Sequence, residues 1–150
     1  NHCGDLAINS GIAEGVEMIV SADHPMTEQQ IVEKLGELQG GKKKHSLIIV
    51  SEKQFANVYD VAKYIEKETG IETRAEVLGH LQRGGSPSAR DRILATEFGV
   101  EAIKALVNDE TSICIGIKND KMVHIDIEEA LAMPRIPNRN LLEVIKLVNR

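Results

Sequence analysis

Leu78-Gly-His-Leu-Gln-Arg-Gly-Gly-Ser-Pro87 combines a histidine and an arginine, three residues apart, with a pair of glycines. Arg83 offers a rigid fork of donors that suits phosphate, and His80 is a compact donor or acceptor. The glycines allow a tight backbone path near a ligand, and Ser before Pro is a good helix opening. The stretch therefore predicts a strand end, an anion-facing loop and a helix start, where phosphates commonly bind. The alternative is a connector whose glycines only turn the chain and whose arginine is solvated.

The segments on either side of this stretch predict the fold. Residues 72–78 alternate in polarity like a strand, and residues 86–108 form a long amphipathic pattern typical of a helix. Other expected helices cover residues 4–15, 27–38, 58–69, 126–133 and 141–148. Other expected strands cover residues 16–20 and 46–51, with a hairpin over residues 111–125. Strands that alternate with helices predict an α/β fold, a layered and largely parallel sheet with helices on both faces.

Composition narrows the class of protein. The chain has 150 residues, with 42% hydrophobic and 27% charged, which is ordinary for a globular protein of one domain or slightly more. A net charge of −5 and an aromatic content of 3% argue against nucleic acid as a partner. No apolar run reaches the roughly 18 to 20 residues of a membrane span, and no signal peptide is recognisable, so we expect a cytoplasmic protein. The opening Asn-His-Cys-Gly-Asp, without an initiator Met, suggests a fragment.

Further polar residues fall where a parallel sheet binds ligands, beyond the carboxyl ends of its strands. Glu52 follows an apolar strand and could accept hydrogen bonds from substrate hydroxyls, or be a surface carboxylate before a helix. Arg74 faces away from its apolar neighbours, toward solvent, another subunit or an ion-pair partner. The lysine turn at residues 42–44 could bind an anionic effector or be a solvated loop. Metal-ligand spacings and Gly-rich nucleotide motifs are lacking, so a nucleotide site would lie outside this chain.

Several motifs, taken together, resemble the bacterial ATP-dependent 6-phosphofructokinases. The likeness runs from residue 1 to about residue 127 in order, weakens after that, and covers the C-terminal half of the family's subunit. The most specific motif is the opening stretch itself. The others are Cys3-Gly-Asp-Leu-Ala7, Gly41-Lys-Lys-Lys-His45, Glu66-Lys-Glu-Thr-Gly70, Glu72-Thr-Arg74, Asp91-Arg-Ile-Leu-Ala95 and the Val-His-x-Asp-Ile of residues 123–127.

The resemblance implies roles for individual residues. His80 and Arg83 would hold fructose 6-phosphate, with Arg83 at the phosphate, and Glu52 would contact the sugar. Arg74 would reach the 6-phosphate in a neighbouring subunit's active site. An effector site for ADP or phosphoenolpyruvate would use Glu17, Lys42 and Lys43.

The resemblance also implies what this segment lacks. The family's ATP and Mg²⁺ loops and its catalytic Asp belong to the other half of the subunit, so no catalytic or metal-binding residue is expected here. The segment alone should not be a kinase, whereas the full-length family enzyme is a homotetramer that makes fructose 1,6-bisphosphate in glycolysis. A catalytically silent regulatory or binding relative and a pyrophosphate-dependent enzyme remain as alternatives.

The family's two lobes map onto this chain in three parts. Residues 1–81 would belong to the smaller, sugar-phosphate-binding lobe and residues 82–133 to the nucleotide lobe. Residues 134–150 would be a linker and a helix that returns to the smaller lobe. The chain departs from the family pattern at Asn1, where an Arg is usual, at Ser21-Ala22-Asp23 in place of a Pro-Glu pair, and at Lys53, where Gly is common. The lysine turn is also shifted, with Gly41 where a first effector lysine is expected.

Overall fold

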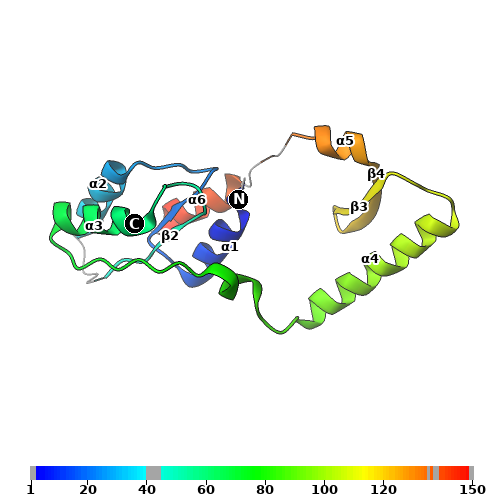
Figure 1. Cartoon of the computed structure of the whole chain (residues 1–150), viewed down its shortest axis with the longest axis horizontal. Helices are drawn as coiled ribbons and strands as arrows, with labels where there is room; N and C mark the ends of the chain where they lie inside the picture. The colour runs from blue at the N-terminus through cyan, green and yellow to red at the C-terminus, as the bar shows by residue number, and fades with distance from the viewer. Residues whose placement is uncertain (1–2, 40–44, 135, 137–138, 149–150) are drawn as a thin grey trace. The chain divides into compact units, whose positions relative to one another are not determined.

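The computed structural model describes residues 3–39, 45–134, 136 and 139–148. It divides the chain into two compact units (Figure 1). Unit 1 comprises Asn1–Leu78 with Ile136–Arg150, and unit 2 comprises Gly79–Arg135.

Unit 1 is built on a short parallel sheet. Strand β1 (Met18–Val20) pairs with β2 (Ile48–Val50) in the register Met18↔Ile48 to Val20↔Val50. Successive side chains of a strand point to opposite faces, so each three-residue strand serves two cores. Met18 and Val20 pack on one face with residues of α2 (Glu28–Gln39) and α3 (Val58–Thr69). Ile19 packs on the other face with Ala7 and Ile8 of α1 (Asp5–Glu14).

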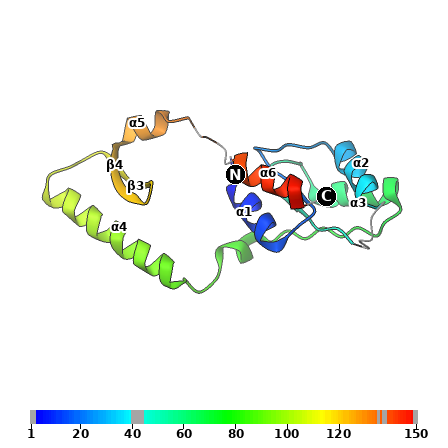
Figure 2. The same cartoon turned by 180° about the vertical axis from the view of Figure 1, so that it is seen from behind.

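The last helix of the chain joins the second of these cores. Leu141, in α6 (Arg139–Val148), packs against the cluster of Ala7, Ile8, Val16 and Ile19. Figures 1 and 2 show α6 beside α1, and α2 beside α3. The layered α/β fold with helices on both faces of a parallel sheet is therefore confirmed.

Local signals explain where the helices of unit 1 begin and end. Thr27 and Gln30 form the predicted capping box, since Thr27 N donates to Gln30 Oε1 (2.8 Å) and Gln30 N to Thr27 Oγ1 (3.2 Å). Asn57 caps α3 by accepting from Tyr59 N at 3.0 Å. Gly15 and Gly70 end α1 and α3 with φ of 66° and 71°, a conformation that glycine adopts without steric cost.

Unit 2 contains one long helix, a hairpin and two short helical segments. The short 3-10 helix η1 (Gly79–Arg83) precedes α4 (Ala89–Val107). Strands β3 (Ile113–Lys118) and β4 (Lys121–Asp126) pair antiparallel, and α5 (Ile127–Ala132) follows. Asn119 and Asp120 connect the strands with φ of 52° and 57°, the positive values that a tight hairpin turn needs. The predicted hairpin is confirmed.

Two expectations about elements were wrong. Residues 72–78 alternate in polarity but form no strand, because none of the described segments pairs with them. The long helix begins at Ala89 rather than at Ser86. Ser88 is its N-cap, because Ser88 and Asp91 complete a reciprocal capping box.

None of the helices in the described ranges is both long and apolar enough to cross a membrane.

Candidate substrate-binding site

The carboxyl edge of the β1–β2 sheet carries Glu52, as predicted. Ser51 N still donates to Val20 O at 2.8 Å, and the chain then leaves the sheet with Glu52 exposed to solvent. The next residue, Lys53, has a φ of 70°. This left-handed conformation is costly for a residue with a Cβ and favours glycine.

The loop after β1 fixes the start of α1 at the same edge. Ser21 and His24 form a two-way backbone bridge, with N···O distances of 3.1 and 3.0 Å. Within this loop, Asp23 Oδ2 accepts from Gly4 N at 2.9 Å. A Cβ on Gly4 would lie 2.5 Å from Ser21 Oγ, so glycine is required for this close approach. The edge is thus a tightly packed corner formed by α1, β1 and β2.

Buried hydroxyl groups lie under this corner. The Oγ atoms of Ser21 and Ser51 are both inaccessible to solvent and have no hydrogen-bond partner among the described residues. Gln54, in the following turn, contacts the backbone of Ser21 and Ala22. With its amide oriented to match the neighbouring donor and acceptor, it donates to Ser21 O (3.2 Å) and accepts from Ala22 N (3.3 Å).

Arg74 is exposed and paired with an acidic neighbour. Its Nε and Nη2 atoms lie 3.0 and 2.6 Å from the same oxygen, Oε1 of Glu72. The two side chains are 87% and 71% exposed, so water screens the pair strongly. A phosphate that bound Arg74 would have to compete with Glu72 for the guanidinium.

His80 and Arg83 lie on the exposed turn η1, at the start of unit 2. Gly79 and Gly85, on either side, have φ of 55° and 146°, so the glycines do allow a backbone path that other residues rarely take. Gln82 Nε2 donates to Gly79 O at 3.0 Å and closes the turn. Glu52 and Arg74, in contrast, belong to unit 1.

Glu17, the expected effector ligand, is a buried residue with a structural contact. Only 7% of it is exposed, and its Oε2 accepts from Leu47 N at 2.7 Å. Its backbone N also donates to Leu47 O at 3.1 Å, so Glu17 fixes the chain just before β2. Lys42 and Lys43 lie outside the described residues.

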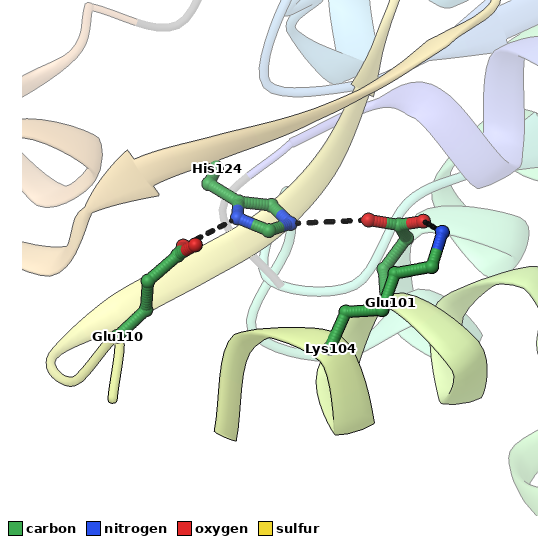
Figure 3. Close-up of polar contacts among 4 residues, drawn as sticks. All are labelled: Glu101, Lys104, Glu110 and His124. Atoms are coloured by element: carbon green, nitrogen blue, oxygen red, sulfur yellow. Dashed lines mark hydrogen bonds and ion pairs between the residues drawn. The ribbon is translucent and has the colours of Figure 1, made fainter. Parts of the chain in front are cut away.

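The sequence interpretation missed a polar cluster in unit 2, shown in Figure 3. His124 of β4 lies between two carboxylates, Glu110 at 2.6 Å from Nδ1 and Glu101 at 3.5 Å from Nε2. Lys104 Nζ lies 2.7 Å from the second oxygen of Glu101. The hydrogen bond from Lys104, aided by the nearby His124, lowers the pKa of Glu101. A histidine within an apolar strand is a weak signal, and its partners depend on how the hairpin packs on α4.

The layered fold and the polar residues at its strand ends place this chain in a structural class. The class consists of α/β proteins that bind ligands beyond the carboxyl ends of their strands. A family model described as Phosphofructokinase matches residues 1–106. This is more than half of the chain, and the chain therefore belongs to the phosphofructokinase family. The resemblance found in the sequence is confirmed.

Individual relatives agree with this assignment. The chain is 44% identical over 138 residues to the ATP-dependent 6-phosphofructokinase of Photobacterium profundum, covering 92% of this chain and 43% of the relative. It is 43% identical over 150 residues to the Clostridium acetobutylicum protein of the same name, covering 99% of this chain and 46% of the relative. The chain thus spans less than half the length of these relatives.

A solved structure supports the fold. Pichia pastoris phosphofructokinase in the T-state matches with a TM-score of 0.78 and 27% sequence identity. The match covers 99% of this chain and 17% of the yeast chain.

Proposed function

We propose that this chain is the substrate- and effector-binding half of an ATP-dependent 6-phosphofructokinase. The observation that carries the proposal is the stretch from Leu78 to Pro87, which places His80 and Arg83 on an exposed, glycine-flanked turn in a chain of this family. The reaction would convert fructose 6-phosphate and ATP into fructose 1,6-bisphosphate and ADP, in glycolysis.

Each proposed substrate residue has a side chain suited to its role. Arg83 can offer two parallel N–H donors to the 6-phosphate, and His80 can donate to or accept from the sugar. Glu52, exposed at the end of β2, can accept hydrogen bonds from sugar hydroxyls. Arg74 would bind the 6-phosphate in a neighbouring subunit's site, after exchanging Glu72 for the phosphate.

The resemblance assigns the reacting groups of the chemical step to the other half of the subunit. The sugar's 1-hydroxyl attacks the γ-phosphorus of ATP, the bond to the β,γ-bridging oxygen breaks, ADP leaves, and a base takes the hydroxyl proton. Within the described ranges, no three or more His, Cys, Asp or Glu side chains gather as metal ligands. As the resemblance implies, we assign ATP, Mg²⁺ and the base to the part of the relatives that this chain does not cover. This chain would hold and orient the sugar, and that orientation would contribute to catalysis by fixing the geometry of the reacting atoms.

The proposal includes regulation and assembly. We infer an effector site for ADP or phosphoenolpyruvate at Glu17, Lys42 and Lys43, and a cytoplasmic homotetramer when the subunit is complete. The resemblance supports these assignments. The burial of Glu17 adds a condition, because an effector would have to compete with Leu47 N for its carboxylate.

A chimaera tests the proposal. The chain would be joined to the part of the Clostridium acetobutylicum relative that it does not cover, replacing that relative's own matching region. We expect ATP-dependent formation of fructose 1,6-bisphosphate in a coupled assay, with the natural relative as the positive control. A folded chimaera that binds fructose 6-phosphate in calorimetry but does not turn over would contradict the proposal and favour a catalytically silent relative.

A further inference from the structure

The turn that carries Glu52 combines a proposed ligand contact with a costly backbone conformation. Glu52 is exposed, and the next residue, Lys53, has a φ of 70°. A residue with a Cβ keeps such a conformation only where the surrounding structure holds it there. The contacts that hold this turn therefore also decide where the carboxylate of Glu52 lies.

Backbone hydrogen bonds hold the two ends of the turn. Ser51 N donates to Val20 O at 2.8 Å, which continues the parallel β1–β2 pairing past Val50. Gln54 N donates to Ser51 O at 3.4 Å, a long hydrogen bond that closes the turn. The Oγ atoms of Ser21 and Ser51 make no hydrogen bond to the described residues, so neither hydroxyl fastens the turn to the neighbouring loop.

The side chain of Gln54 extends the pairing beyond the strand ends. Its amide, in the orientation that matches the neighbouring donor and acceptor, donates to Ser21 O at 3.2 Å and accepts from Ala22 N at 3.3 Å. A carboxamide has the same kinds of donor and acceptor as a peptide unit, so this side chain acts as a continuation of the β2 backbone. Gln54 is half-buried, so its hydrogen bonds face less competition from water than those of a fully exposed side chain.

The loop that receives this amide is itself fixed within unit 1. Ser21 is fully buried and exchanges two backbone hydrogen bonds with His24, at 3.1 and 3.0 Å. Between them, Asp23 Oδ2 accepts from Gly4 N at 2.9 Å, which ties the loop to the start of α1. Because the loop is anchored in this way, a contact with it can restrain the turn that carries Glu52.

We propose that Gln54 is a positioning residue for substrate binding, whose amide ties the turn to the loop after β1 and so holds the Glu52 carboxylate where the sugar hydroxyls would bind. This inference rests on the proposed function, which gives Glu52 its contact with the sugar. Gln54 acts through Glu52 rather than on the substrate. Its loss therefore weakens binding of fructose 6-phosphate and leaves binding of ATP unaffected.

The first test measures the restraint by NMR in the 150-residue chain and needs no enzymatic activity. Gln54→Met keeps the length of the side chain but removes its amide. We expect the backbone order parameters of Glu52 and Lys53 to fall from about 0.85, typical of rigid backbone, toward the flexible range below about 0.6. Gln29→Met, which removes an exposed amide elsewhere in unit 1, should not change them. Unchanged order parameters in Gln54→Met would overturn the proposal.

The second test measures substrate binding in the active chimaera. Gln54→Met should raise the KM for fructose 6-phosphate about three- to tenfold, the size expected for loss of a neutral hydrogen bond, with kcat and the KM for ATP nearly unchanged. Gln29→Met should change none of these constants.

A double variant shows whether Gln54 acts through the carboxylate. Glu52→Ala should raise the KM for fructose 6-phosphate, and adding Gln54→Met should raise it no further, because the amide then has no carboxylate to position. An unchanged KM in either single variant, or effects that multiply in the double variant, would overturn the proposal. An inactive chimaera would instead contradict the proposed function, and the order parameters of the 150-residue chain would still decide the role of Gln54.

Discussion

At the scale of single residues, one lysine of the proposed site has an unfavourable backbone dihedral angle. Lys53 has a φ of 70° directly after Glu52, at the edge proposed to contact the sugar. The other described non-glycine residues with positive φ are Asp109, Ser112, Asn119 and Asp120. Asn and Asp tolerate this region better than lysine does, so the conformation of Lys53 is costly.

Replacing Lys53 with glycine should therefore stabilise unit 1. We expect Lys53→Gly to raise the free energy of unfolding by up to about 1 kcal/mol, measured by urea denaturation, because glycine adopts this conformation without a Cβ clash. Lys63→Gly in the exposed middle of α3 is the matched control and should cost about 1 kcal/mol. Equal losses in the two variants would show that the φ of Lys53 carries no strain.

The sequence alone can propose candidate site residues from their neighbours in the chain, but it cannot show which residues have distant partners. His80, Arg83 and Glu52 could be selected from their neighbours in the chain. The contact of His124 with Glu101 and Glu110 could not, because it depends on packing between a strand and a helix. Glu17 lies inside an apolar strand pattern, where a carboxylate needs a hydrogen-bond partner, and its Oε2 accepts from Leu47 N.

At the scale of elements, the capping box at Thr27 and the hairpin over residues 111–125 were predictable, whereas the start of α4 and the lack of a strand at residues 72–78 were not. Residues 58–69 form a helix as expected, because the chain itself supplies both the apolar spacing and the terminating Gly70. The alternation of residues 72–78 looks like a strand, yet a strand also needs a neighbouring backbone, which the described chain does not provide. Ser86 before Pro87 was predicted to open the long helix, but the N-cap is Ser88, because Asp91 three residues later completes its capping box.

The N-terminal cap of α4 should weaken at acid pH. Asp91 Oδ2 accepts from Ser88 Oγ and Ser88 N at 2.8 and 2.7 Å, and these hydrogen bonds lower the pKa of Asp91. Because the pKa of Asp91 is lowered in the folded state, its ionised carboxylate stabilises the helix at pH values above the ordinary pKa of Asp. This stabilisation is lost as the pH falls through the folded-state pKa. We expect the first turn of α4 to fray over that acid range, followed by carbon chemical shifts of residues 89–92.

Asp91→Asn provides the control for this prediction. An asparagine at this position does not titrate in the acid range, so the first turn should show no transition there. A wild-type first turn that keeps its chemical shifts throughout the acid range would contradict the assigned role of the carboxylate.

At the scale of the whole molecule, unit 2 resembles a part of a larger core. Four apolar residues of α4 are each at least 60% exposed, namely Ile93, Ile103, Leu106 and Val107. Exposed apolar surface of this kind marks an interface or an aggregation hazard. The relatives are more than twice as long as the matched region, and we expect their remaining part to supply a cover for this face.

The 150-residue chain on its own should therefore associate with itself. Light scattering should show oligomers that become fewer when Ile103 and Leu106 are both replaced by Gln, because the association is driven by apolar area. The chimaera should instead form a single defined species. A monodisperse monomer of the unmodified chain at micromolar concentration would count against this expectation.

The central claim is that this chain holds the phosphorylated sugar through its glycine-flanked turn, and Arg83 in the active chimaera tests it most directly. Arg83→Ala should raise the KM for fructose 6-phosphate at least about tenfold and leave the KM for ATP nearly unchanged, because a charge-assisted hydrogen bond is worth roughly 1.5 to 3 kcal/mol. Arg90→Ala, which changes another exposed arginine at the start of α4, should change neither constant. An unchanged KM for fructose 6-phosphate in Arg83→Ala would contradict the account.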